Sequence, residues 1–309
     1  MTARILGVHE DRPPADTAAD YPGHTWGGAF VSNRGRPLPK NTSAKRLKSL
    51  VLNGAAPYTD AGGGCLVRVK IDMAAAARGD WDERLTELGA VCVGERIVLV
   101  IYHEPEDNMK ASTFVPGFNR ARQAIKAGGP SVDVAYAGMA YQWRPGASKT
   151  ADDPKAWAEN LQADFYLLDV YFGQTFGQSL TLANHPGRVR WHAHMLAPYP
   201  ERRAGLAEWG RMADPGRAAG FRADFDWLAN TADGRRYEVV CPWGTDGTEK
   251  NAGWLLDDEA RAAIREGFAL LAQPNQPAGF RPASVPDVLV CEQYGCLVAQ
   301  DLASRHTHP

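Results

Sequence analysis

The sequence has few cysteines and no long apolar run. Its five cysteines are odd in number and scattered along 309 residues, which is not the pattern of a disulfide framework. No apolar stretch reaches the length of a membrane-spanning helix, and the N-terminal segment lacks the apolar core of a signal peptide. We therefore expect no signal peptide and no membrane partner. Cys65, Cys92 and Cys241 lie among apolar residues, and we expect them in the core.

An excess of charge of one sign is also absent. Lys and Arg together number 34 and Asp and Glu number 36, so the formal net charge is -2. Because binding to nucleic acid depends on neutralising phosphates with basic side chains, we expect no nucleic-acid partner. A balanced surface is better suited to a neutral polymer such as a polysaccharide.

The sequence lacks a Gly-rich dinucleotide or P-loop fingerprint after any predicted strand, which counts against a doubly wound open sheet. Strand and helix patterns alternate over residues 1–272, with about eight strand candidates. This number of strands and this length predict an α/β fold, the (β/α)8 TIM barrel. The predicted strands are Arg4–His9, Trp26–Ser32, Cys65–Asp72, Ile97–His103, Asp133–Gln142, Asp164–Tyr171, Arg203–Trp209 and Tyr237–Trp243.

Two glutamates stand out at the ends of predicted strands. The apolar strand Ile97–His103 is followed by Glu104, and the seventh predicted strand carries Glu208 near its end. In a barrel both positions belong to the same C-terminal face, so the two carboxylates should face each other across a cleft. Cleavage of a glycosidic bond requires such a pair, one as proton donor and one as nucleophile or base. The alternative at Glu104 is a buried strand followed by an acidic surface loop.

This pattern resembles the clan of retaining glycoside hydrolases that carry their two glutamates after strands four and seven. The closer resemblance is to glycoside hydrolase family 26, the β-mannanase-like family, in which a His precedes the first glutamate, as His103 precedes Glu104. The His-Glu-Pro-Glu form resembles a divergent bacterial branch of that family. Further matches, in order and spacing, are Asp169-Val170-Tyr171, Ala207-Glu208-Trp209-Gly210, Pro242-Trp243 and Trp254-Leu255-Leu256.

The resemblance covers residues 1–272 and implies retaining hydrolysis of a β-linked polysaccharide without a catalytic cofactor. It implies that Glu104 is the acid/base, that Glu208 is the nucleophile and that Tyr171 hydrogen-bonds the nucleophile. His103 would orient Glu104 and contact the sugar. The expected substrate-binding residues are His103, Tyr171, Trp143, Trp243, Lys70 and Asp169, with the two tryptophans as stacking platforms for a pyranose.

Elementary chemistry adds expectations for the same site. A general acid must keep its proton near neutral pH, so the pKa of Glu104 should be raised while Glu208 stays ionised. A carboxyl separation of about 5–5.5 Å would indicate retention. Glu106 and Asp107 are expected to bind sugar hydroxyls or, in the favoured interpretation, to form a solvated loop. Lys70 could reach a sugar hydroxyl or pair with a site carboxylate.

Other functions are compatible with such a barrel. One alternative is a catalytically weak or inactive glycan-binding or structural protein, for example a phage tail protein with assembly partners in a virion or cell-surface complex. The absence of a secretion signal favours this alternative, and it predicts a cytoplasmic or virion-associated chain. The presence of both glutamates favours catalysis. A barrel enzyme of another class would need a Schiff-base lysine or a histidine cluster at the strand ends, and only Lys70 comes near to this.

The C-terminal segment has a different composition. Residues 273–286 are rich in Pro, Gln and Ala and are expected to form a linker, and residues 287–309 a small separate element. Four residues there could bind a structural zinc ion: Cys291, Cys296, His306 and His308. The alternative is a strand with two incidental cysteines and a disordered, His-containing end.

Overall fold

The computed structural model describes residues 4–8, 17, 19–21, 26–32, 35–147, 153–173, 180–244 and 252–273. Eight parallel strands form one sheet in the order β1-β8-β7-β6-β5-β4-β3-β2. A parallel bridge between Gly7 and Trp26 joins the two ends of this sheet, and the Val8 amide donates to the Trp26 carbonyl oxygen at 3.1 Å. The predicted (β/α)8 barrel is therefore confirmed.

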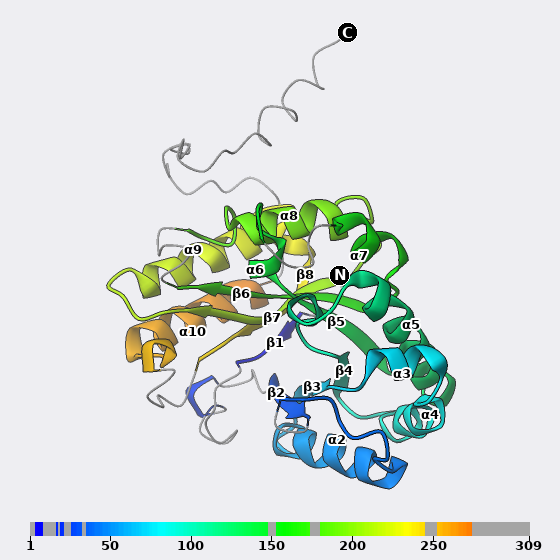
Figure 1. The fold of residues 1–309 in the computed structure, drawn as a ribbon. Helices are drawn as coiled ribbons and strands as arrows, with labels where there is room; N and C mark the ends of the chain where they lie inside the picture. Colours follow the sequence, from blue (N-terminus) through cyan, green and yellow to red (C-terminus); the bar gives the residue numbers. More distant parts are fainter. Residues whose placement is uncertain are drawn as a thin grey trace. The chain divides into compact units, whose positions relative to one another are not determined.

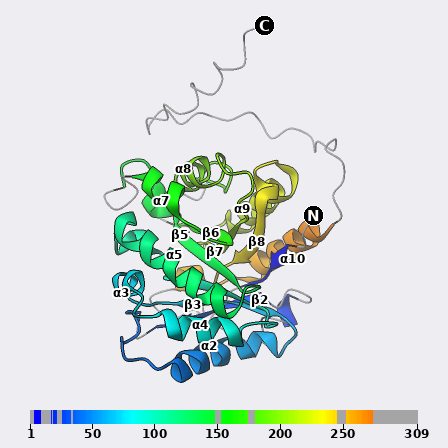
Figure 2. The same ribbon diagram turned by 90° about the vertical axis from the view of Figure 1, so that its right-hand side faces the viewer.

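The strands and helices alternate along the chain, and the helices pack around the outside of the strands (Figure 1). The strands are β1 (Ile5–Leu6), β2 (Trp26–Val31), β3 (Gly64–Val69), β4 (Ile97–Ile101), β5 (Asp133–Met139), β6 (Phe165–Phe172), β7 (Ala204–Arg211) and β8 (Tyr237–Pro242). The helices are α2 (Ala44–Thr59), α3 (Met73–Arg78), α4 (Asp82–Val91), α5 (Ala111–Gly128), α6 (Ala140–Trp143), α7 (Pro154–Asn160), α8 (Pro186–Met195), α9 (Arg217–Asn230) and α10 (Asp258–Ala272). In both views of the ribbon, α2 and α8 lie on opposite sides of the strands (Figures 1 and 2).

Two short helices were not expected from the sequence. Helix α3 begins after Asp72, whose carboxylate accepts from the Ala75 amide at 3.0 Å, and it ends at Gly79, which has a φ of 91°. An aspartate cap and a left-handed glycine are the usual signals for the two ends of a helix. Helix α6 follows β5 directly and contains Trp143, so the predicted strand Asp133–Gln142 is three residues too long.

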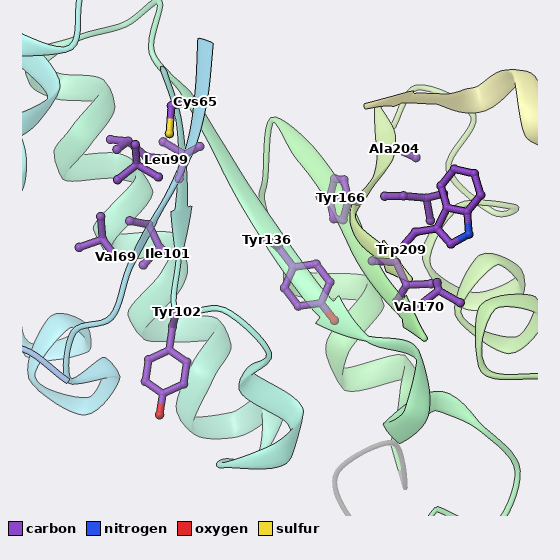
Figure 3. Close-up of a cluster of buried hydrophobic side chains, with 14 of the residues drawn as sticks. Cys65, Val69, Leu99, Ile101, Tyr102, Tyr136, Tyr166, Val170, Ala204 and Trp209 are labelled. Atoms are coloured by element: carbon purple, nitrogen blue, oxygen red, sulfur yellow. The ribbon is translucent and has the colours of Figure 1, made fainter. Parts of the chain in front are cut away.

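Alternate residues of the strands enter two apolar layers. Leu66, Val98 and Val100 belong to a cluster inside the barrel, whereas Cys65, Val67 and Leu99 belong to the larger cluster between the strands and the helices. Figure 3 labels ten side chains of the larger cluster. Because every parallel strand is covered on both faces, the barrel strands appear in the sequence as continuous apolar runs.

Strand β7 contains one extra residue near its middle. Leu168 of β6 pairs with Leu206, but the next residue, Asp169, pairs with Glu208, so Ala207 is left over. Ala207 packs in the inner cluster and Trp209 in the outer one, so Ala207 and Glu208 are two consecutive residues facing the barrel interior. A register shift of this kind changes where a side chain points, and such shifts are common beside active sites.

Cys65, Cys92 and Cys241 are buried free cysteines, as predicted. Among the residues that the structure describes, no helix is long and apolar enough to cross a membrane.

The chain divides into a unit of Met1–Gln273 and a second unit of Pro274–Pro309. The second unit, including the predicted zinc ligands Cys291, Cys296, His306 and His308, lies outside the described residues. The linker, the small C-terminal element and its zinc site therefore stay predictions.

Candidate active site

A sharp turn after β4 places Glu104 at the C-terminal face of the barrel. Two residues of this turn, Tyr102 and Glu104, have positive φ values of 58° and 50°. Non-glycine residues adopt this left-handed conformation at an energetic cost, so it persists only where neighbouring contacts hold it. The Glu104 amide donates to the Ala137 carbonyl oxygen of β5 at 3.0 Å, and Pro105 starts a short 3-10 helix over Pro105–Asp107. The turn leaves the Glu104 side chain only partly exposed.

Glu104 has the protonation behaviour of a general acid. Loss of hydration is the main cause that raises its pKa to about 8, and the nearby carboxylates of Asp169 and Glu208 raise it further, while His103 lowers it. A carboxyl with this pKa keeps its proton at neutral pH and can donate it. The expected raised pKa of Glu104 is therefore confirmed.

Glu208 is held from both sides. The Tyr171 hydroxyl donates to its Oε2, and the Arg68 guanidinium lies 2.9 Å from its Oε1. Arg68 also donates to the Ala207 carbonyl oxygen at 3.1 Å, so one buried cation contacts both the extra residue of β7 and the carboxylate that follows it. An opposite charge and a donated hydrogen bond both stabilise an ionised carboxylate. Burial acts to lower the pKa of Arg68, but the carboxylates of Glu208 and Asp169 outweigh it and raise this pKa.

His103 lies between the carboxylates of Asp169 and Glu208. Its Nε2 lies 2.7 Å from Oδ2 of Asp169 and 3.7 Å from Oε1 of Glu208. Burial lowers the pKa of His103, against the carboxylates of Glu208 and Glu104, which act to raise it. Asp169 is fully buried, which contradicts the expectation that it binds substrate directly. Asp169 contacts His103, which is itself partly exposed.

The same residues offer donor atoms for a metal ion. Among the described residues, His103, Glu104 and Asp169 each bring one potential ligand atom within 4.8 Å of the others. Within this group, the imidazole nitrogen of His103 and the Asp169 oxygen contact each other at 2.7 Å.

Two further expectations, for Trp143 of α6 and for Glu106 of the turn after β4, are wrong. Trp143 is 0% exposed and therefore offers no open face for stacking on a sugar. Glu106 is also 0% exposed, so it neither binds sugar hydroxyls nor belongs to a solvated loop. Its carboxylate accepts hydrogen bonds from the Trp143 indole at 2.8 Å, from the Met139 amide at 3.3 Å and from the Tyr136 hydroxyl. These contacts tie the turn that carries Glu104 to β5 and α6.

Replacing Glu106 by alanine should destabilise the protein by about 2–4 kcal/mol, because the buried donors of Tyr136 and Trp143 lose their acceptor. It should also lower kcat more than it raises KM, because the turn would no longer hold Glu104 in place. Urea unfolding and steady-state kinetics measure the two effects. Glu106→Gln keeps one acceptor oxygen and should lose less than half as much stability. A Glu106→Ala protein with the stability and kcat of the wild type would contradict the anchoring role.

The remaining predicted residues lie around this centre. The Lys70 ammonium lies 4.8 Å from the centre of the Tyr102 ring, and its reach to a sugar or a carboxylate stays a prediction. Trp243, after β8, is partly exposed and packs edge-on against Tyr171 at 5.3 Å and against Trp254 at 5.5 Å. Its role as a stacking platform also stays a prediction. Tyr171 donates to Glu208, as expected.

Sequence reasoning missed Arg68, although a signal was available. Arg68 interrupts the apolar run Cys65–Val69 of a strand buried on both faces. A charged residue in such a run must be paired with an opposite charge. A second buried ion pair lies at the end of β7. Arg211, three residues after Glu208, donates to Asp224 of α9 at 2.7 Å, and Asp224 also accepts from Trp209 at 3.1 Å. This pair fixes the end of β7 against the helix layer.

Solved structures with similar folds include several glycoside hydrolases. An endo-β-1,4-glucanase from Xanthomonas axonopodis pv. citri, carrying a triple mutation, has a TM-score of 0.63 at 12% identity, over 85% of this chain and 98% of that one. The catalytic domain of the GH26 endo-β-1,4-mannanase of Bacillus sp. JAMB-750 has a TM-score of 0.58 at 12% identity, over 86% of each chain. A variant of GH5_18 from Streptomyces cattleya in complex with Manβ1-4GlcNAc has a TM-score of 0.62 at 16% identity, over 91% of this chain and 83% of that one. These likenesses establish the barrel fold, whereas no family model and no curated protein matches the chain.

Proposed function

We propose that this barrel is a glycoside hydrolase that cleaves a β-linked polysaccharide with retention of configuration. The observation that carries the proposal is the contrast between two neighbouring glutamates. Glu104 keeps its proton, with a pKa raised to about 8 by loss of hydration, whereas Glu208 lies against a guanidinium and a tyrosine hydroxyl that stabilise its negative charge. A pair of carboxyl groups driven to opposite protonation states is what distinguishes a catalytic acid from a nucleophile.

In the first step, Glu208 attacks the anomeric carbon while Glu104 donates its proton to the departing glycosidic oxygen. The bond to the leaving sugar breaks, and a covalent glycosyl–enzyme ester forms. In the second step, the ionised Glu104 removes a proton from water, which attacks the anomeric carbon and releases Glu208. Two inversions at one carbon give net retention, and no cofactor is required.

The neighbouring residues have distinct tasks in this mechanism. Arg68 and Tyr171 fix both oxygens of Glu208 and stabilise the carboxylate that is regenerated when the ester is hydrolysed. His103 contacts Asp169 on one side and is 15% exposed, so its ring can still meet a sugar hydroxyl. Trp243 presents an aromatic side chain at the end of β8, where stacking on a pyranose would orient the sugar.

The choice of sugar follows from the sequence motif and from the fold neighbours. The resemblance of the His103-Glu104 motif points to family 26, and one fold neighbour is a GH26 endo-β-1,4-mannanase. Another neighbour is an endo-β-1,4-glucanase. Both support a β-1,4-linked glycan, with mannan as the first substrate to try.

The test is the release of reducing ends from β-mannan, β-glucan, xylan, galactan and arabinan by the intact chain. We expect release from a β-1,4-linked polymer, and proton NMR should show the β-anomer of the new reducing end forming first. Appearance of the α-anomer first would contradict retention. Binding to a glycan without any release would instead support the glycan-binding alternative.

A further inference from the structure

Phe30 in β2 is the most exposed large apolar side chain that the described residues contain, at 55%. It does not face the helices. Its register partner in β3 is Arg68, and side chains of paired residues in a parallel sheet point to the same side. Trp26, four residues earlier in the same strand, packs against the inner apolar cluster. Alternation along β2 therefore directs Phe30 toward the interior of the barrel.

An inward-facing residue is exposed only where the barrel opens. Phe30 pairs with Arg68 one residue before the last pair of β2 and β3, at the C-terminal end of the strands where Glu104 and Glu208 lie. The exposed ring area therefore faces the catalytic end of the barrel and not the outer surface between helices.

The ring contacts two residues of the site. The Arg68 guanidinium carbon lies 4.8 Å from the ring centre, and the His103 ring lies edge-on at 5.4 Å with an interplanar angle of 83°. Arg68 contacts Glu208, and His103 contacts both Asp169 and Glu208. Phe30 is thus one residue removed from the nucleophile, and its position is fixed by the groups that hold the nucleophile.

We propose that Phe30 is a sugar-binding platform, on which a pyranose unit of a β-1,4-linked glucan or mannan stacks beside the catalytic carboxylates. Aromatic rings bind pyranoses through the apolar face formed by the axial C–H bonds, and removal of this face and the ring from water is favourable. A phenyl ring has no polar group that favours contact with water, so covering the exposed part of the Phe30 ring with the apolar face of a sugar would be favourable. The proposal rests on the proposed function, since it concerns the same cleft.

Opposite the β2 side, the closed strand order places Tyr171 of β6 and the neighbouring Trp243 and Trp254. The carboxylates thus have an aromatic side chain at β2 and an aromatic group near β6 and β8. Two such surfaces suit a chain of several sugars better than a single sugar, because one ring can hold each side of the bond to be cleaved.

The experiment compares Phe30→Ala, Phe30→Tyr and Val93→Ala with the wild-type chain. Val93 is 51% exposed and lies in the turn between α4 and β4, at the opposite end of the barrel, which makes it a matched control for loss of an exposed apolar side chain. The probes are cellopentaose and β-1,4-mannopentaose, measured by steady-state kinetics and by calorimetric titration. We expect Phe30→Ala to raise KM about tenfold, equivalent to about 1.4 kcal/mol, with kcat changed less than about twofold. Val93→Ala should stay near the wild-type values, and Phe30→Tyr, which keeps the aromatic ring, should raise KM less than Phe30→Ala does.

The outcomes separate this proposal from the proposed function. Hydrolysis by the wild type with an unchanged KM in Phe30→Ala would overturn the platform and leave the hydrolase standing. Binding without hydrolysis, weakened about tenfold in Phe30→Ala, would support the platform and overturn the hydrolase. A fall in kcat with KM unchanged would show that Phe30 only positions His103, which also overturns the platform. If the wild type neither binds nor cleaves either probe, both are overturned.

Discussion

Replacing Glu208 by alanine should lower kcat on a β-1,4-glycan by about 10⁴-fold or more, because the variant lacks the carboxylate that we propose forms the covalent intermediate. Azide should restore part of the turnover in this variant, since it can enter the space of the missing carboxylate and attack the anomeric carbon. The product would be an α-glycosyl azide from a β-linked substrate, and NMR identifies its configuration. Unchanged activity of Glu208→Ala would show that the nucleophile is another residue.

The same substitution also affects stability. The Arg68 side chain is 1% exposed and pairs with Glu208 at 2.9 Å. Removing one partner of a buried ion pair leaves the other charge uncompensated, at a cost of about 3–5 kcal/mol. Glu208→Ala is therefore best studied beside the double variant Arg68→Met/Glu208→Ala, in which both charges of this pair are removed. Activity lost equally in both, with stability restored only in the double variant, would separate the chemistry from the fold.

Replacing Glu104 by glutamine should lower kcat on natural glycans by about 10²–10⁴-fold, because the departing oxygen loses its proton donor. A dinitrophenyl glycoside needs no protonation of its leaving group, so the formation of its glycosyl–enzyme should be nearly unaffected. A burst of dinitrophenol followed by slow turnover is the expected result, since the second step still lacks its base. Equal losses on both substrates would contradict the role of Glu104 as the acid.

The pH dependence of Glu104 has a definite sign. Its pKa is raised from an ordinary value of 4.5 to about 8, so activity that depends on its proton should fall as the pH rises through about 8. Between these two values the folded state holds a proton that the unfolded state releases, so stability falls as the pH rises across this window. Glu104→Gln cannot titrate and should lack this part of the decline, which thermal unfolding at several pH values can measure. Identical profiles for both proteins would contradict the raised pKa.

The strands and the position of Glu104 were predictable from the sequence for a physical reason. A barrel strand is apolar on both faces, so runs such as Ile97–Ile101 stand out, and the polar residue that ends a run marks the catalytic face. The burial of Trp143 and Glu106 was not predictable, because it depends on a tight turn into α6 and on the contact between the segments that follow two adjacent strands, β4 and β5. The pairing of Arg68 with Glu208 joins residues that are far apart in the chain, and nothing local specifies it.

The exposure of Phe30 was likewise not predictable from the sequence. Within the sequence, a phenylalanine in a strand predicts core packing, and only the closed barrel shows that this strand position reaches the open end. The pairing register of β2 and β3 supplies this information, because it places Phe30 beside Arg68, which contacts Glu208.

The extra residue of β7 has a consequence for comparisons between barrels. Because Ala207 and Glu208 both face inward, the strand departs from the two-residue period that a gapless alignment assumes. Counting the alternation from Gly205 onward would place Ala207 inward and Glu208 outward, although Glu208 contacts Arg68 inside the barrel. Leaving Ala207 out of the count restores the alternation, since Leu206 and Glu208 then follow each other as outward and inward residues. For the same reason, a deletion of Ala207 would shorten a central strand while keeping Glu208 directed into the barrel.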